Sequence, residues 1–247
     1  MTRIRAIAFD CYGTLIQADA EHYIRTFDGI IREQGLAVGA KELWDCWLEA
    51  LRASQGEEGA DPAALITRAD PPFAPYRETW VDHFRAAFQA AGLAGDPHAA
   101  TASLHRLLGE AEAYPEVPEV LAALRGRYRL ALVSNADDDW LYACLRKNGL
   151  TEWETAVSSE EVRAYKPHPA IFREALRRLD LRPEEVLYVG DSPYADILGA
   201  HHMGMPVAWV NRRGAPLPRR VPQPTVTITT LAGLLDILPE LDPAAAK

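Results

Sequence analysis

The sequence lacks most of the features that mark specialised classes of protein. Its 247 residues include only three cysteines, whose spacing matches neither a disulfide framework nor a zinc site. We therefore expect a reduced, cytoplasmic protein. No apolar run approaches the roughly 18 residues that a membrane span needs, and the apolar stretch near the amino terminus is too short for a signal peptide. These absences exclude a membrane as the expected partner.

Positive charge is also scarce. The chain has 26 Lys and Arg against 35 Asp and Glu, which gives a formal net charge of −9 at pH 7. This balance argues against nucleic acid as a partner, because a phosphate backbone attracts basic surfaces. An anionic substrate would have to be attracted by local cations, a metal ion or helix N-termini. The composition, 48% hydrophobic and 25% charged, is that of a globular protein, and it leaves the oligomeric state open.

Residues 16–112 carry apolar residues at helical spacing, which predicts a helical insert between two parts of the chain. The stripes occupy residues 23–31, 43–51 and 76–88, and a fourth helix is expected from Pro97. Gly35 is the expected C-cap of the first helix, and Asp96 is the expected N-cap of the fourth. Residues 56–75 are rich in Gly, Asp and Pro and form an expected loop, with one helical turn near 63–67.

After residue 112 the pattern changes to short apolar runs separated by amphipathic segments. The expected strands in this part are 130–133, 155–157, 186–189 and 207–210, and the expected helices are 117–124, 138–147, 169–179 and 194–203. The apolar run at 6–9, before the insert, is expected to be a further strand of the same sheet. Strands alternating with helices predict an α/β fold with a parallel sheet and right-handed crossovers. We expect residues 1–15 and 113–247 to form this α/β core. In it, the acidic run 137–139 would cap the helix that follows, and residues 212–224 would form a surface loop.

Polar residues stand where the predicted strands end. The set comprises Asp10, Thr14, Ser134, Asn135, Lys166, Asp191 and Asp196. The carboxyl ends of parallel strands lie at one edge of a sheet, so these side chains are expected to converge. Three carboxylates in one site repel one another unless a cation is present, and Mg²⁺ with substrate phosphate oxygens fits such a donor set. Lys166 would add a second positive charge, and Ser134 could hold an anionic oxygen.

The order of these residues resembles the four motifs of the haloacid dehalogenase-like hydrolase superfamily. The matching segments are Phe9-Asp10-x-x-Gly13-Thr14-Leu15, Val133-Ser134-Asn135, Lys166-Pro167 and Gly190-Asp191 with Asp196. One such motif is weak evidence, whereas four in the right order are specific. The resemblance implies a Rossmann-like core, with the insert as a small helical cap and the active site between them.

Carried over by position, the resemblance also implies a role for each residue. Asp10 would be the nucleophile that forms an aspartyl ester. Ser134 and Asn135 would bind the substrate with Lys166, which would also orient Asp10, and Thr14 would support the loop. Mg²⁺ would be held by Asp10, Asp191, Asp196 and the main-chain carbonyl of Tyr12.

Tyr12 departs from the pattern of the phosphatases in this superfamily, which usually carry a second aspartate at that position as the general acid–base. A phenol with a pKa of about 10 could donate a proton as a substitute but would not readily take it back. The string Asp10-Cys11-Tyr12-Gly13-Thr14 instead resembles 2-haloacid dehalogenases, in which halide leaves without a proton and no metal is needed. In those enzymes we expect a Tyr at the position of Phe172, and no acidic pair such as Asp191 and Asp196.

The two ends of the expected site therefore favour different reactions. Two buried carboxylates are costly without a cation, whereas a tyrosine needs no compensation, so the acidic pair weighs more. The sequence predicts a hydrolase with an aspartate nucleophile, acting as a Mg²⁺-dependent phosphatase on small phosphorylated metabolites. The alternatives are a metal-independent 2-haloacid dehalogenase and a weakly active binding protein of the same fold.

Overall fold

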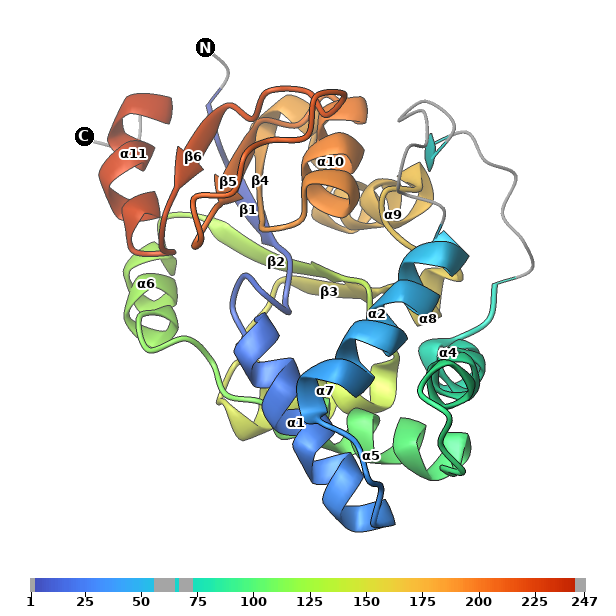
Figure 1. Cartoon of the computed structure of the whole chain (residues 1–247). Coiled ribbons are helices and arrows are strands. Elements are labelled where there is room, and N and C mark those ends of the chain that lie inside the picture. Colours follow the sequence, from blue (N-terminus) through green and yellow to red (C-terminus); the bar gives the residue numbers. More distant parts are fainter. Residues whose placement is uncertain (1–2, 56–64, 67–72, 243–247) are drawn as a thin grey trace.

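A sheet of six parallel strands forms the centre of the computed structural model, which describes residues 3–55, 65–66 and 73–242 (Figure 1). The strands lie in the order β3-β2-β1-β4-β5-β6. They span Ala6–Phe9 (β1), Arg129–Ser134 (β2), Thr155–Ser158 (β3), Val186–Gly190 (β4), Val207–Val210 (β5) and Val226–Ile228 (β6). This arrangement confirms the predicted α/β fold class. β1 lies in the middle, paired with β2 on one side and β4 on the other.

Helices cover both faces of the sheet, and the alternation of side chains along β1 shows how. Ile7 and Phe9 belong to the apolar cluster that includes α6, α7 and α11, whereas Ala6 and Ala8 belong to the cluster on the opposite face, with α9 and α10. The helices are α6 (Val117–Leu124), α7 (Asp138–Lys147), α8 (Ser159–Val162), α9 (Pro169–Leu179), α10 (Gly199–His202) and α11 (Gly233–Leu241). Burial on both faces explains why the strands are almost continuously apolar.

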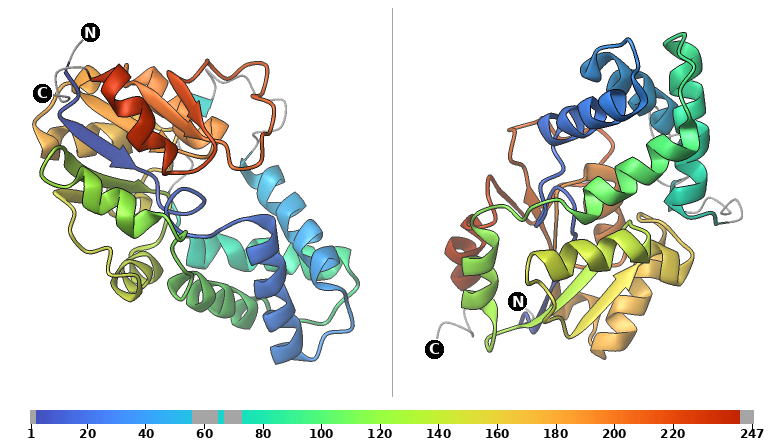
Figure 2. Two further views of the ribbon diagram at one scale, coloured as in Figure 1. Left: turned by 90° about the vertical axis from the view of Figure 1, so that its left-hand side faces the viewer. Right: turned by 90° about the horizontal axis from the view of Figure 1, so that it is seen from below.

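In the described part of the chain, four longer helices gather beyond the end of the sheet toward which β1 points (Figure 1, Figure 2). We call them the cap helices: α1 (Ala20–Gln34), α2 (Ala40–Gln55), α4 (Tyr76–Ala90) and α5 (Pro97–Gly109). Their ends follow the sequence signals. The Asp96 carboxylate accepts hydrogen bonds from the amides of His98 and Ala99, and Gly35 takes the left-handed conformation with φ +63°.

Some expectations differ from the structure. β6 and α11 were not predicted, because three residues of strand and a short helix interrupted by Pro239 carry little periodic signal. The helix expected at 194–203 is instead a π-helical segment over Pro193–Leu198 followed by α10. The helical turn expected near 63–67 falls largely outside the described residues. No helix in the described part of the chain combines the length and apolar character of a membrane span.

The acidic run at 137–139 lies at the start of α7 as predicted, with Asp138 and Asp139 in the first turn, but one of its residues has a different partner. Asp137 makes no side-chain hydrogen bond to its own helix, α7. Its two carboxylate oxygens instead accept from the amides of Tyr76 and Arg77, each at 2.8 Å, at the start of cap helix α4. The first amides of α4 have no acceptor within that helix, so the fully buried Asp137 carboxylate supplies it. A residue of the core therefore serves as the N-terminal hydrogen-bond acceptor for α4.

Candidate active site

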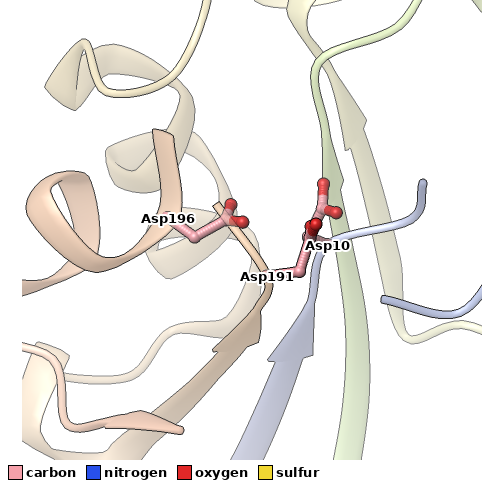
Figure 3. Close-up of side chains that lie close together, drawn as sticks. All are labelled: Asp10, Asp191 and Asp196. Atoms are coloured by element: carbon pink, nitrogen blue, oxygen red, sulfur yellow. The ribbon is translucent and has the colours of Figure 1, made fainter. Parts of the chain in front are cut away.

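The polar residues predicted at strand ends come together where β1, β2 and β4 end, and Figure 3 shows the three aspartates among them. Asp10 follows β1 directly, Ser134 is the last residue of β2, and Asp191 follows β4. The amide of Asp10 donates to the carbonyl oxygen of Val189 at 2.9 Å, which continues the β1–β4 pairing one step past the strand. The sheet itself therefore aims these side chains at one point.

Three carboxylates form the centre of this site. Asp10, Asp191 and Asp196 each offer an oxygen atom, and these oxygens lie within 4.8 Å of one another. Asp10 and Asp196 are buried, and Asp191 is partly buried. Glycines make room for them: a Cβ atom on Gly13 would overlap the Asp191 carboxylate, and one on Gly190 would overlap that of Asp196. Gly13 also has φ +90°, a conformation that favours glycine.

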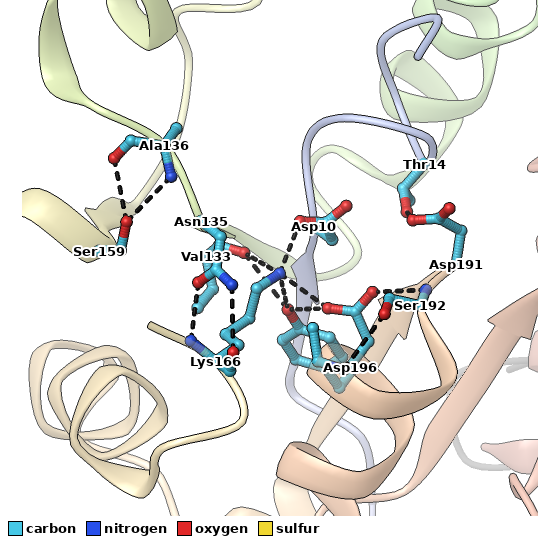
Figure 4. A network of polar contacts seen from close by, with 12 residues as sticks. Asp10, Thr14, Val133, Asn135, Ala136, Ser159, Lys166, Asp191, Ser192 and Asp196 are labelled. Atoms are coloured by element: carbon cyan, nitrogen blue, oxygen red, sulfur yellow. Dashed lines mark hydrogen bonds and ion pairs between the residues drawn. The ribbon is translucent and has the colours of Figure 1, made fainter. Parts of the chain in front are cut away.

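Lys166 brings a positive charge to two of these carboxylates (Figure 4). Its Nζ lies 2.6 Å from Asp10 Oδ1 and 2.7 Å from Asp196 Oδ1, and it also donates to the carbonyl of Val133 and the hydroxyl of Tyr188, both at 3.1 Å. Burial alone would lower the pKa of the ammonium group, but Asp10 and Asp196 hold that pKa well above its ordinary value. Lys166 is therefore a fixed cation.

The carboxylates themselves are destabilised in their charged form. Burial raises the pKa of Asp10 to about 6, against the opposing effect of Lys166. The pKa of Asp191 is raised well above its ordinary value by burial and by the charges of Asp10 and Asp196. Burial is the largest cause for both groups, so a cation bound beside Asp10 and Asp191 would favour their charged forms.

The donor atoms fit a hard divalent cation. All three side chains offer carboxylate oxygens, the ligands that Mg²⁺ prefers. Among the described residues, the carboxylate of Asp191 has a single hydrogen-bond partner, the Thr14 hydroxyl at 3.4 Å, and no lysine or arginine pairs with it. The charge that remains uncompensated at Asp191 is the kind that a bound cation would neutralise.

Ser134 and Asn135 lie beside this cluster and differ in whether their side chains are hydrogen-bonded. The side chain of Asn135 accepts from the amide of Lys166 at 2.7 Å and donates to its carbonyl at 3.1 Å, so it holds the main chain of the lysine. The hydroxyl of Ser134 is buried and has no hydrogen-bond partner in the described part of the chain. An unpaired buried hydroxyl is costly, and a substrate oxygen would satisfy it.

Tyr12 turns toward the cap. Its hydroxyl donates to the carbonyl of Leu108 in α5 at 3.2 Å, and its ring centroid lies 4.7 Å from that of Trp140. Burial raises its pKa well above the ordinary value. The proton that Tyr12 was expected to offer as an acid substitute is thus directed at the cap in this conformation.

Two residues of the site were not predicted from the sequence. Tyr188 lies within the buried strand β4, and its hydroxyl donates to Asp196 Oδ1 at 3.1 Å. The amide of Ser192 donates to the other oxygen of Asp196 at 2.9 Å. A tyrosine inside an otherwise aliphatic strand was the available signal. Phe172, at the position where a tyrosine is expected in dehalogenases, packs against the Tyr188 ring at a centroid distance of 5.2 Å.

The cap contributes one phenol to the surroundings of the cluster. Tyr23 of α1 has its pKa raised to about 12, first by burial and then by the charges of Asp191 and Asp10. It therefore keeps its proton at neutral pH and can act as a hydrogen-bond donor. Two other polar cap residues are engaged elsewhere: Arg25 pairs with Glu21 on the surface, and His83 is buried next to Trp47.

This arrangement suits attack by a carboxylate on an electrophile. Asp10 is buried at a strand end, with one oxygen held by Lys166. A covalent ester on Asp10 is the chemistry that a fixed carboxylate nucleophile supports. The adjacent unpaired Ser134 hydroxyl and the acidic pair define the two other parts of such a site, one for substrate and one for a cation.

Comparison with known proteins places this site in context. Residues 4–204 match the family model described as "haloacid dehalogenase-like hydrolase". The chain is 29% identical over 221 residues to (S)-2-haloacid dehalogenase 1 of Pseudomonas sp. (strain CBS-3), covering 87% of this chain and 88% of that protein. It is 32% identical over 190 residues to phosphoserine phosphatase of Thermus thermophilus, covering 75% of this chain and 72% of that protein.

Solved structures share the fold. The L-2-haloacid dehalogenase RSc1362 superposes with a TM-score of 0.80 at 23% sequence identity, covering 96% of this chain and 99% of that one. Dehalogenases are prominent among the related sequences, and phosphatases occur as well.

Proposed function

The chain belongs to the haloacid dehalogenase-like hydrolases, and from this premise we propose that it is a Mg²⁺-dependent phosphatase of small phosphorylated metabolites. The observation that carries the proposal is the acidic cluster of Asp10, Asp191 and Asp196, whose oxygens lie within 4.8 Å of one another. A displacement at carbon, with halide as leaving group, has no use for three neighbouring carboxylates. Phosphoryl transfer uses a cation at this place, because charge on the phosphoryl oxygens must be offset.

The chain's own residues divide the work as follows. An oxygen of Asp10 attacks phosphorus as the bond from phosphorus to the leaving oxygen breaks, which leaves an aspartyl-phosphate. Water then attacks that phosphorus, releases inorganic phosphate and regenerates the Asp10 carboxylate. Lys166 orients Asp10 and offsets charge, the Ser134 hydroxyl is free to bind a phosphoryl oxygen, and Asn135 holds the main chain of Lys166.

The metal site in this proposal consists of Asp10, Asp191, Asp196 and the main-chain carbonyl of Tyr12. Mg²⁺ bound there would supply charge neutralisation for the phosphoryl oxygens. Two neighbouring side chains fix the position of Asp191. The Thr14 hydroxyl donates to its carboxylate, and the Trp209 indole donates to its main-chain carbonyl at 2.9 Å.

A second candidate is 2-haloacid dehalogenase activity, which two observations favour. Dehalogenases are prominent among the relatives, and Tyr12 occupies the position of the usual acid–base. The same residue shapes the phosphatase proposal, because loss of a general acid–base costs about 10²–10⁴-fold in rate. We therefore expect phosphate esters with good leaving groups to be the best substrates.

The substrate test compares p-nitrophenyl phosphate, glycerol phosphate and L-2-chloropropionate, each with Mg²⁺ and with EDTA. We expect Mg²⁺-dependent phosphate release, faster from p-nitrophenyl phosphate because p-nitrophenolate leaves without a proton. Chloride release that is insensitive to EDTA would overturn the proposal in favour of the dehalogenase. No turnover together with Mg²⁺-induced thermal stabilisation would favour a binding protein of this fold.

Stability should depend on pH and Mg²⁺ together. The raised pKa values of Asp10, about 6, and of Asp191 mean that the folded protein binds protons more tightly than the unfolded chain. The contribution of these two groups to the stability of the metal-free protein is therefore largest in acid and is lost as pH rises through about 6. Mg²⁺ binds the deprotonated groups, so it should raise the melting temperature more at pH 7.5 than at pH 5.

The size of this effect follows from mass action. Mg²⁺ at a hundred times its Kd would add about 2.7 kcal/mol, or roughly 5–10 °C for a chain of this length. Thermal unfolding with Mg²⁺ or EDTA at both pH values measures it. The Asp191→Asn variant serves as the control and should show little shift. Equal shifts in wild type and control would contradict the proposed metal site.

A further inference from the structure

Arg212 does not lie free in the surface loop predicted for residues 212–224. Its side chain is only 18% exposed. Nε lies 3.4 Å from the carbonyl oxygen of Gly13, one terminal nitrogen lies 3.0 Å from that of Thr14, and the other lies 2.7 Å from a carboxylate oxygen of Glu116. The guanidinium also stacks on the ring of Tyr114, 3.5 Å from its centroid. One planar group thus contacts four residues from two distant segments.

Those two segments are the passages between core and cap. The chain leaves the core just after Thr14 and returns just before Tyr114. The two passages pair with each other: the amide of Tyr114 donates to the carbonyl of Leu15 at 2.9 Å, and that of Gln17 donates to the carbonyl of Glu112 at 2.8 Å. Arg212 therefore contacts both the loop that follows Asp10, at Gly13 and Thr14, and the segment that returns from the cap, at Tyr114 and Glu116.

The loop that presents Arg212 is itself held in place. The Asn211 side chain both donates to the carbonyl of Ala215 and accepts from its amide, each at 2.9 Å. Gly214 completes this turn with φ +64°. On the far side, Glu116 also accepts from the amide of Leu231 at 3.3 Å. Both ends of the contact are thus fixed to the core, which is what a rigid support requires.

We propose that Arg212 is a positioning residue, which holds the Asp10 loop against the core at the point where the chain passes into the cap. A planar guanidinium can bond two successive carbonyl oxygens and a carboxylate while its face stacks on the Tyr114 ring, whereas the ammonium group of a lysine has no flat face to stack. Without it the carbonyls of Gly13 and Thr14 lose their anchor, and Asp10 and the Tyr12 carbonyl shift with the loop. Misplacement by about 1 Å can cost about 10²-fold in rate.

The test compares Arg212→Met and Arg212→Lys with the control Arg213→Met, which changes the exposed neighbour. The activity readout rests on the proposed function, so kcat and KM are measured on whichever substrate the wild type hydrolyses. We expect kcat to fall about 10- to 100-fold in Arg212→Met with KM little changed, and to fall less in Arg212→Lys, which keeps the positive charge. Arg213→Met should behave as wild type.

A second readout needs no substrate. The amides of Leu15 and Ile16 both donate to the carbonyl of Cys11, at 2.8 and 2.9 Å. In Arg212→Met their hydrogen exchange should be faster than in Arg213→Met, while exchange in β4 is unchanged. Equal kcat and equal exchange in these two variants would overturn the proposal. If Arg212→Met does not fold, Arg212→Lys decides, and wild-type kcat with wild-type exchange would overturn it equally.

Discussion

Asp10→Asn is expected to abolish turnover, with a loss in kcat of about 10⁴-fold or more. The neutral amide cannot form the covalent ester, and the other side chains of the site cannot replace it, because Asp191 and Asp196 are committed to Thr14, Lys166 and Tyr188. The result is expected with phosphate esters and with 2-haloacids alike, since both reactions begin with the same carboxylate. Single-turnover and steady-state rates measure the loss.

The fold should survive this substitution. It removes one of three mutually repelling carboxylates, and Lys166 keeps its contact of 2.7 Å with Asp196. The melting temperature at pH 7.5 should therefore equal or exceed that of the wild type, as expected for an acid whose pKa is raised by burial. Asp236→Asn, on the exposed side of α11, is the matched control and should keep full activity. Activity above a tenth of wild type in Asp10→Asn would refute the assignment of the nucleophile.

Lys166→Met is expected to have the largest effect on stability. Methionine fills a similar volume but leaves Asp10 and Asp196 buried without their cation, and loss of one partner of a buried ion pair costs about 3–5 kcal/mol. Urea unfolding at pH 7.5 in EDTA should show this loss in the free energy of unfolding. Added Mg²⁺ should restore part of it, because a bound cation offsets the same charges.

The control for this variant is Lys41→Met, on the surface of α2. Lys41 pairs with Asp45 at the helix surface, where both side chains are at least half exposed. Such pairs contribute at most about 1 kcal/mol, so little change is expected. A loss below about 1 kcal/mol in Lys166→Met would show that the carboxylates carry little charge in the folded protein, and would remove the argument for a cation.

Much of the site could be predicted from the sequence, because its residues stand directly at the ends of strands. Asp10, Ser134 and Asp191 follow apolar runs, and parallel pairing brings such ends to one edge. The helical cap was predictable for a similar reason, since its stripes of aromatic residues leave a clear period. Fold class, family and the convergence of the acidic residues follow from local patterns of this kind.

What could not be predicted depends on contacts between distant segments. Tyr188 reads as one more core residue of β4, and only the folded chain shows its hydroxyl next to Lys166. Asp137 carries the signal of a cap for α7, yet its oxygens bond amides about 60 positions earlier in the chain. Arg212 lies almost 200 positions from the carbonyls it contacts. No local pattern encodes such partners.

The contact between Tyr12 and Leu108 sets a structural cost on replacing Tyr12 by the acid–base aspartate that the proposed phosphatase reaction would use. The obvious change is to introduce an aspartate at position 12, but the tyrosine hydroxyl now donates to a carbonyl in the last turn of α5. A carboxylate has no proton to donate to that carbonyl and no ring to pack, so the hydrogen bond to Leu108 and the contact with Trp140 would both be lost. A substitution that adds an acid–base group would thus remove a contact between the core and cap helix α5. Any lineage or laboratory selection that takes this route should need a compensating change at the end of α5.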